Sequence, residues 1–508
     1  MRNSVTLIAA LVPWLVLTSP ADAQDNATSG GGAIGVVRLE RALVQVTRRV
    51  EGSVVAIARY RLPASGPDRP SPPPTTVDPD HPDFIPNEYG TGIVVAVPGD
   101  STRRLILTCY HVVRGGPVAH PAKPPRTDRQ RLHVRFANRR GCPARILAAD
   151  PRSDLAVLEL DPAELKRAGI KPQTLPPLQI AARPVPRKGR FVLMLGNPFA
   201  IARDGSASVG WALVSNTHRR AVTLGGGATA EHSIHRLGTL LQLDTRLKHG
   251  TSGGPVFDLD GQLLALTTST APHDGIETAA GFAIPIDGPI SRIINTLQKG
   301  LEVEYGFLGI QPDDVSARQL SGYNGTFDQA GAARAARVFR GSPAHRGGVQ
   351  GGDLILAVDG APVRGRYELM RQIELAGPGR KLKLELWRET TRRRVRVSVR
   401  LGKWPVPDRS GLIASKQRHP AWRGLQIDFP TGRRRFVPDS FEFPRAVVVT
   451  AVLPGSQAAA AGIEAGDFIE LIAGQAAETP AEFYRAVNSR RGSVSLKLLD
   501  GRRMTLEP

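Results

Sequence analysis

The C-terminal part of the chain contains an internal repeat, which limits the possible folds more than any other feature of the 508-residue sequence. The segment Gly341–Gly360 (GSPAHRGGVQGGDLILAVDG) aligns without gaps with Gly455–Gly474 (GSQAAAAGIEAGDFIELIAG). Downstream, Glu368–Ile373 and Glu482–Val487 lie at the same offset from the two copies. A repeat distance of more than 100 residues is too long for a solenoid. The repeat therefore predicts two tandem domains of mixed β structure, each with a short helix.

A different pattern fills the region before the repeat. Between Gly90 and Ile294, short runs rich in β-branched residues recur, bounded by Gly, Pro, Asn or Asp. Many short strands with turn signals at this spacing indicate a β-sandwich or a β-barrel. We expect helices from Gly35 onward, ahead of a strand at Ser53–Ala58, and at Pro289–Lys299. The Pro-rich segment 61–87 should be a long exposed loop without helix or central strand.

The first residues have the organisation of a secretory signal peptide. Arg2 precedes an apolar run from Val5 to Leu17, and Ala21–Ala23 supplies small residues before Gln24. We expect cleavage after residue 23 and an exported chain, periplasmic or extracellular. An uncleaved anchor is the alternative reading of the same run.

Charge and cysteine content narrow the classes of function. The net charge of +21 comes from basic residues spread over the whole chain, without a zinc finger, an RNA-binding signature or a basic helix. We therefore expect no nucleic-acid partner, and at most weak association with an anionic envelope surface. Cys109 and Cys142 are the only cysteines, which excludes a disulfide framework and a four-cysteine zinc site. In an exported chain the two can form one bridge, a pairing that spacing alone does not decide.

Three polar residues stand beside predicted strands in a way that suggests nucleophilic catalysis. Ser252 lies in a turn of the sequence GTSGGP, where Gly250 and the two following glycines let the Gly250 and Ser252 N–H groups converge in front of the hydroxyl. His111 follows the apolar strand Leu105–Thr108, and Asp154 precedes another. Each residue alone is more simply a turn or surface residue. Their order, His, Asp, Ser, is that of chymotrypsin-like proteases and not of subtilisins or α/β-hydrolases.

With these motifs in place, the chain resembles the HtrA/Deg family of exported serine proteases that carry PDZ domains. The resemblance rests on TCYHVV, DPRSDLAVLEL, LGNPF, GTSGGPVFDLDG and GFAIPID, followed by two repeats that open near YGFLGI and WRGLQI. It implies a triad of His111, Asp154 and Ser252, an oxyanion hole from the Gly250 and Ser252 amides, and no cofactor or metal. It also implies assembly as a homotrimer or a multiple of trimers.

The PDZ units should bind peptides by strand addition and hold a terminal carboxylate on backbone N–H groups. In the first unit this assigns Phe307, Leu308, Gly309 and Ile310 to the carboxylate loop and strand, with Leu369 and Ile373 as groove walls. In the second unit it assigns Gly424, Leu425, Gln426 and Ile427, with Phe483 and Val487 opposite. Any of the apolar residues can instead fill the core. The segment Gln311–Asp328 is interpreted as an insert that can occlude the first groove.

The sequence thus predicts a mainly β chain with a chymotrypsin-like double β-barrel protease domain followed by two PDZ domains. The expected bounds are a signal peptide at 1–23, the protease domain at 35–300, PDZ domain 1 at 303–402, a linker at 403–420 and PDZ domain 2 at 421–508. The expected function is a serine endopeptidase that cleaves misfolded or mislocalised proteins, with PDZ domains that recruit substrates or regulate activity. The nucleophile loop, Lys248–Thr251, lacks the family's usual Asn-Pro-Gly-Asn. A chaperone-like peptide-binding scaffold with a latent protease site therefore remains the alternative.

Overall fold

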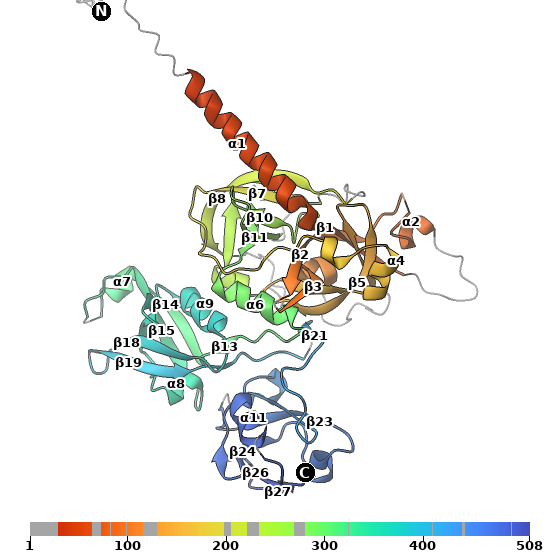
Figure 1. Ribbon diagram of the computed structural model, residues 1–508. Helices are drawn as coiled ribbons and strands as arrows, with labels where there is room; N and C mark the ends of the chain where they lie inside the picture. Colours follow the sequence, from red (N-terminus) through yellow and green to blue (C-terminus); the bar gives the residue numbers. More distant parts are fainter. Residues whose placement is uncertain are drawn as a thin grey trace, which may run out of the picture. The chain divides into compact units, whose positions relative to one another are not determined.

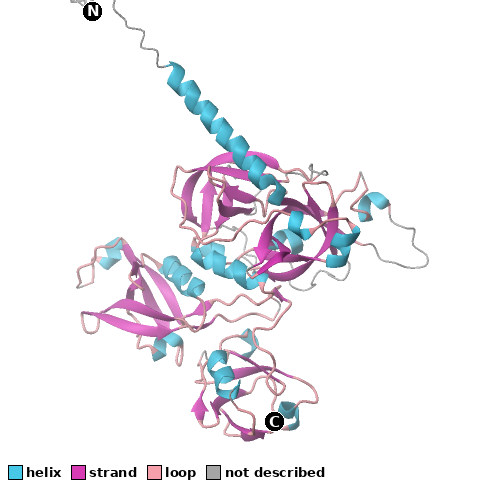
Figure 2. Ribbon diagram, viewed as in Figure 1, coloured by secondary structure: helices cyan, strands magenta, loops and turns pink. Residues whose placement is uncertain are grey.

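The computed structural model describes residues 29–62, 73–81, 83–97, 99–114, 130–197, 205–220, 233–268, 280–323, 325–408, 410–438, 442–488 and 490–508. The expected signal peptide lies outside the described residues. Figure 1 shows the course of the chain, and Figure 2 shows that strands predominate in the folded parts.

Two six-stranded barrels form the region in which the sequence predicted a sandwich or a barrel. In the first, the strands follow the order β5-β4-β1-β2-β3-β6, and pairing of β6 with β5 closes the barrel. In the second, β10-β11-β12-β9-β8-β7 form a closed barrel. The bounds are β1 (Val54–Arg61), β2 (Glu88–Val97), β3 (Asp100–Cys109), β4 (Gln130–Phe136), β5 (Gly141–Asp150), β6 (Leu155–Leu160), β7 (Phe191–Gly196), β8 (Ser208–Arg219), β9 (Leu240–Leu243), β10 (Pro255–Phe257), β11 (Leu263–Thr268) and β12 (Gly281–Pro285).

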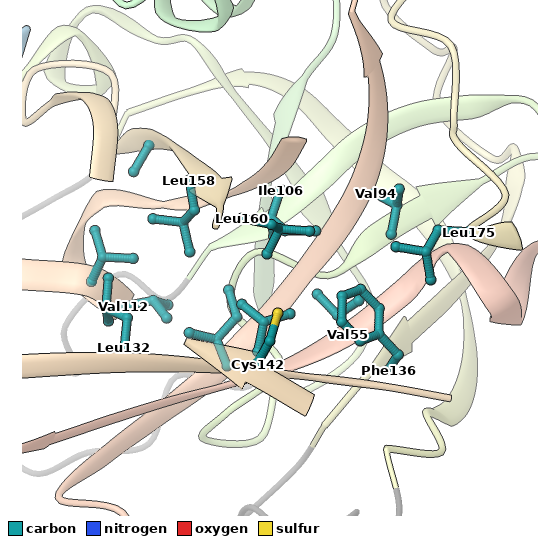
Figure 3. Close-up of a cluster of buried hydrophobic side chains, with 14 of the residues drawn as sticks. Val55, Val94, Ile106, Val112, Leu132, Phe136, Cys142, Leu158, Leu160 and Leu175 are labelled. Atoms are coloured by element: carbon teal, nitrogen blue, oxygen red, sulfur yellow. The ribbon is translucent and has the colours of Figure 1, made fainter. Parts of the chain in front are cut away.

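Apolar side chains fill each barrel, which explains the β-branched runs. Val94, Ile106, Val134 and Leu158 of the first barrel are fully buried. Figure 3 shows these strands contributing side chains to one cluster, with Cys142 among them. Strands buried in this way stabilise a barrel mainly by removing apolar surface from water.

The internal repeat corresponds to two sheets of the same topology, as expected for tandem domains. The first follows the order β14-β15-β16-β18-β19 and the second β22-β23-β24-β26-β27, each with one further short strand beside the third. The bounds are β14 (Ile310–Ser316), β15 (Gly331–Val338), β16 (Leu354–Val358), β17 (Ala361–Pro362), β18 (Lys381–Arg388) and β19 (Arg393–Arg400), then β22 (Leu425–Asp428), β23 (Val447–Val452), β24 (Phe468–Ile472), β25 (Gln475–Ala476), β26 (Val494–Leu498) and β27 (Arg503–Leu506). Each sheet has one longer helix, α9 (Arg366–Ala376) or α11 (Pro480–Asn488).

The predicted helices are present at nearly the expected positions. They are α1 (Ser29–Val50) and α6 (Gly288–Gln298), and the side chain of Asp287 caps α6 by accepting from the Ile290 N–H. Among the described residues, no helix is long and apolar enough to cross a membrane. The remaining short helices are α2 (Pro74–Val77), α3 (Tyr110–Arg114), α4 (Pro162–Arg167), α7 (Ala317–Leu320), α8 (Pro343–Arg346) and α10 (Gln457–Ala460).

Three segments without expected regular structure contain short helices or strands. The Pro-rich segment contains the one-turn helix α2, which begins at Pro74, a position where a proline is tolerated because its missing N–H has no partner in a helix. The expected linker contributes β21 (Ile413–Ala414), which pairs with β5 of the first barrel. The supposed insert Gln311–Asp328 begins with the edge strand β14 and continues into helix α7.

Candidate active site

Strand register brings His111 and Asp154 together. β3 and β6 are antiparallel neighbours, with Cys109 opposite Leu155. His111 follows β3 by two residues, on the one-turn helix α3, and Asp154 immediately precedes β6. Asp154 has a positive φ of 54°, a conformation that aspartate tolerates better than most residues. The chain turns sharply there, and the Tyr110 N–H donates to the Asp154 carbonyl oxygen at 2.9 Å.

The Asp154 carboxylate holds the His111 ring from one side. His111 Nδ1 lies 2.8 Å from Oδ2 and 3.0 Å from Oδ1, and the His111 backbone N–H also donates to Oδ1 at 3.0 Å. Thr268 Oγ1 donates to Oδ2 at 2.8 Å. These contacts orient the ring and place the Nδ1 proton toward the carboxylate, which leaves Nε2 as the nitrogen able to accept a proton.

The electrostatics of the pair follow from burial and charge. Burial lowers the pKa of His111, but the charge and hydrogen bond of Asp154 together with the charge of Glu88 raise it by more, so that the pKa lies above its ordinary value. For Asp154, burial raises the pKa, yet His111 and the hydrogen bonds from His111 and Thr268 lower it overall. A carboxylate that stays ionised beside an imidazole is suited to stabilise the imidazolium that forms when the ring accepts a proton.

Ser252 lies in a tight turn of the second barrel, on the connection from β9 to β10. Its side chain is buried, with 7% relative exposure. Gly250 and Gly253 adopt φ values of 93° and 84°, which are strained for any residue with a Cβ. Among the described residues, neither the Gly250 nor the Ser252 N–H donates to a protein acceptor. The turn therefore leaves two backbone donors without a protein acceptor among the described residues, at the positions that the sequence assigned to the oxyanion hole.

Thr91 and its neighbours join the Ser252 turn to the first barrel. The Thr91 N–H donates to the Ser252 carbonyl oxygen at 2.9 Å, and Thr91 Oγ1 donates to the Gly250 carbonyl oxygen at 2.8 Å. Thr108, three residues before His111, donates from Oγ1 to the Thr91 carbonyl oxygen at 2.6 Å. A Cβ at Gly253 would collide with that same carbonyl oxygen and with the Thr108 hydroxyl. The two barrels are thus in direct contact here, with Ser252 next to the segment that leads to His111.

Sequence reasoning missed Thr91, Thr108 and Thr268, the hydroxyl residues that hold the site together. All three are almost fully buried. A threonine within a β-rich run gives no local sign of such a role, because strands are rich in threonine anyway. The ring of His249, two residues before Thr251, packs edge-on against Tyr89, with ring centroids 4.7 Å apart. Lys248 is exposed.

The predicted peptide-binding residues of the first PDZ unit lie at a sheet edge. Ile310 begins β14, the outermost strand of its sheet. Leu308, Leu369 and Ile373 are buried in one cluster, so in this structure they fill the core. The Phe307 ring is half-buried and packs edge-on against the Phe443 ring, with centroids 5.5 Å apart.

The second unit repeats this arrangement. Leu425, Gln426 and Ile427 belong to its edge strand β22, and the preceding Gly424 has a positive φ of 91°. Phe483 and Val487 of α11 are buried in the core cluster, with relative exposures of 0% and 1%.

The comparisons with known proteins agree with the fold. A trypsin-like peptidase domain matches residues 90–266, and PDZ domains match residues 306–399 and 448–500. A probable periplasmic serine endoprotease, DegP-like, from Hahella chejuensis is 27% identical over 413 residues, covering 81% of this chain and 77% of that protein. A protein of the same description from Brucella suis is 29% identical over 360 residues, covering 70% of this chain and 64% of its own length. The solved structure of the HtrA-type protease AlgW with a tripeptide is 22% identical, covers 72% of this chain and 98% of that chain, and has a TM-score of 0.50, which supports the fold alone.

Two closed barrels with His111, Asp154 and Ser252 at their contact, followed by two sheets of PDZ topology, define a trypsin-like peptidase with tandem PDZ domains. The similarity to the HtrA/Deg family of PDZ-bearing serine proteases that the sequence motifs predicted is confirmed.

Proposed function

We propose that this protein is an exported, periplasmic serine endopeptidase that cleaves misfolded or mislocalised proteins by an acyl-enzyme mechanism. The observation that carries the proposal is the pairing of His111 Nδ1 with Asp154 Oδ2 at 2.8 Å, which Thr268 fixes from the other side. A purely structural histidine in a trypsin-like domain does not need a carboxylate, itself held by a threonine, to orient its ring in this way. The names of the relatives support export to the periplasm.

Each residue has a defined step in this mechanism. Ser252 Oγ attacks the scissile carbonyl carbon while His111 Nε2 accepts its proton, and His111 then donates that proton to the leaving amine. Asp154 keeps the proton of the neutral ring on Nδ1 and stabilises the imidazolium. The Gly250 and Ser252 N–H groups donate to the developing oxyanion, and one such donor contributes about 3 kcal/mol to lowering the barrier. Water hydrolyses the acyl-enzyme by the same steps in reverse order.

The PDZ domains would recruit unfolded chains or C-terminal peptides as substrates. β14 and β22 are both edge strands, and an edge strand leaves backbone N–H and C=O groups available for pairing with an extended peptide. The loop residues Phe307–Gly309 and Gly424 stand directly before these strands, where a terminal carboxylate would be held. By resemblance to the family, we propose that the protein assembles as a homotrimer or a multiple of trimers, which light scattering of the purified chain would test.

Labelling with a fluorophosphonate probe tests the proposal. Mass spectrometry of the labelled mature chain is expected to locate the adduct at Ser252, and the same preparation should cleave an unfolded protein. Ser252→Ala should lose both the adduct and the cleavage. If no label is incorporated even in the presence of a PDZ-binding peptide, the site is not assembled. The chaperone-like scaffold then becomes the better reading.

The pH dependence of labelling provides a second prediction. Only the neutral His111 ring accepts the Ser252 proton, and the pKa of His111 is raised by the Asp154 and Glu88 carboxylates, which outweigh burial. We therefore expect the labelling rate to fall as the pH decreases through a midpoint above the ordinary histidine value. Glu88→Gln should move this midpoint to lower pH. A rate that stays constant, or rises, as the pH is lowered through this range would contradict the assignment of His111 as base.

A further inference from the structure

Cys109 lies inside the candidate active site but has no part in the proposed hydrolysis. It is the last residue of β3 and is fully buried. Its Sγ points toward the Thr267 carbonyl oxygen, at 3.5 Å, on the strand that also carries Thr268. The Cys109 Sγ, a ring nitrogen of His111 and a carboxylate oxygen of Asp154 lie within 4.8 Å of one another. Among the described residues, this is the one group of three such side chains close enough to surround a single metal ion.

The donor atoms of this group match the preferences of zinc. Thiolate sulfur, imidazole nitrogen and carboxylate oxygen are its usual protein ligands, and three of them with an open fourth position are a common arrangement. Bond lengths of about 2.0 to 2.3 Å place the ligand atoms of one zinc ion roughly 3 to 4 Å apart. The observed His111–Asp154 separation of 2.8 Å is slightly shorter than this. The separations within the group extend to no more than 4.8 Å, so shifts of the carboxylate and the thiol by about 1 Å would admit the ion.

We propose that Cys109, His111 and Asp154 form a binding site for a thiophilic divalent cation such as Zn²⁺, and that its binding inhibits the protease. The ion would bind His111 through Nδ1, the nitrogen that faces Asp154. A neutral ring bound through Nδ1 carries its proton on Nε2. Nε2 then cannot accept the proton of Ser252, so the nucleophile stays inactive. This inhibitory part rests on the proposed function, whereas binding of the ion does not.

The binding step balances without an oxidant or a reductant. The Cys109 thiol loses its proton to solvent and forms the sulfur–metal bond, while the ring proton of His111 moves from Nδ1 to Nε2. One proton is released for each ion bound, so binding strengthens as the pH rises. The ion would enter past His111 and Asp154, whose side chains are 23% and 17% exposed, whereas Cys109 itself is closed off from solvent.

Cobalt absorption of an inactive chain tests binding without reference to activity. We expect Co²⁺, added to the tag-free Ser252→Ala chain under a non-chelating reductant, to give the near-ultraviolet charge-transfer band of a cobalt–thiolate bond, and excess Zn²⁺ to displace it. A second substitution in the same chain, Cys109→Ser, should abolish the band and weaken Zn²⁺ binding by at least about tenfold. The matched control is Cys142→Ser, because Cys142 lies among apolar side chains in the barrel core, and this variant should keep the band.

The outcomes separate the two parts of the proposal. A band that persists in Cys109→Ser, or is absent from the Ser252→Ala chain, overturns the site. Cys109→Ala removes the same ligand with a different side chain. Thermal unfolding of metal-free Cys109→Ser and Cys109→Ala distinguishes loss of the ligand from misfolding of the barrel. If the band behaves as expected, Zn²⁺ should reduce fluorophosphonate labelling of the chain that retains Ser252, and EDTA should restore it. Labelling unaffected by bound Zn²⁺ would overturn the inhibitory part alone.

Discussion

Replacement of Asp154 by asparagine is expected to lower kcat for peptide cleavage by about four orders of magnitude while leaving the fold intact. The reason lies in the donors that surround the carboxylate. The His111 backbone N–H and Thr268 Oγ1 both donate to it. An asparagine would keep its carbonyl oxygen at the position of Oδ1, where it accepts from the His111 backbone N–H. Its NH₂ group would then take the position of Oδ2, facing His111 Nδ1 and the Thr268 hydroxyl oxygen, which can accept. The ring would then carry its proton on Nε2, the tautomer that cannot accept a proton from Ser252.

Steady-state cleavage of an unfolded protein, with thermal unfolding of each variant, would measure this effect. Asp161→Asn is a suitable control, because Asp161 is an exposed carboxylate of the same domain that caps helix α4. We expect it to change kcat little. If Asp154→Asn retained kcat within about tenfold of the unsubstituted chain, Asp154 would not select the tautomer of His111.

The parts of this structure that depend on local pattern could be predicted from the sequence. The β-branched runs, the ungapped repeat and the Pro289–Lys299 segment correspond to barrels, tandem sheets and helix α6. The order of the residues and the resemblance to the family predicted His111 and Asp154 as partners, and strand register brings them together. Such features are set by periodicity and by short turns, which a sequence displays directly.

Strand β14 shows why other elements were missed. Its residues include Pro312, Asp313 and Asp314, which all disfavour strands, and the segment was therefore interpreted as an insert. The strand forms because it lies at the sheet edge, and a register shift between Gln311 and Pro312 accommodates the proline. Strand β21 is only two residues long and exists only through pairing with β5. The local sequence shows neither the edge position of β14 nor the distant pairing partner of β21.

The contacts around Asp154 also depend on residues that are far apart in the sequence. Thr268 and Cys109 come from β11 and β3, strands of different barrels that meet only in the folded chain. The resemblance to the family implied no metal, and two cysteines exclude a four-cysteine zinc site. The proposed zinc ligands come from two separate points in the chain, Cys109 with His111 and then Asp154, and only the fold brings these two points within reach of one another.

Replacement of Lys403 by methionine is expected to destabilise the protein by about 3 to 5 kcal/mol. Lys403 is almost fully buried, with 2% side-chain exposure, and its Nζ lies 2.7 Å from Glu302, 3.2 Å from Glu304 and 2.8 Å from Asp428. Burial lowers the pKa of Lys403, but Asp428, Glu302 and Glu304 raise it by more, so the amine stays charged. Methionine would fill the space of the aliphatic stem but leave these carboxylates without their central cation.

Urea unfolding of the unsubstituted protein and of Lys403→Met at neutral pH, followed through the transition of the PDZ region, would measure the loss of unfolding free energy. Lys497→Met is the matched control. Lys497 pairs with Glu470 at 2.9 Å, but both side chains are 36% exposed, and an ion pair of this kind contributes at most about 1 kcal/mol. Equal destabilisation by the two substitutions would show that the Lys403 cluster is no more important than a surface pair.

The pH dependence of the Lys403→Met effect distinguishes loss of charge compensation from loss of packing. In the unsubstituted protein, burial raises the pKa of Glu302 but Lys403 and Arg433 lower it overall. A carboxyl group with a lowered pKa in the folded state adds stability above its unfolded pKa, and this stability is lost as the pH falls through the folded value. The variant has no Lys403 charge, so protonation of its buried carboxylates in acid relieves the uncompensated charge. The stability difference between the two proteins should therefore shrink as the pH falls, whereas a packing defect would give the same difference at every pH.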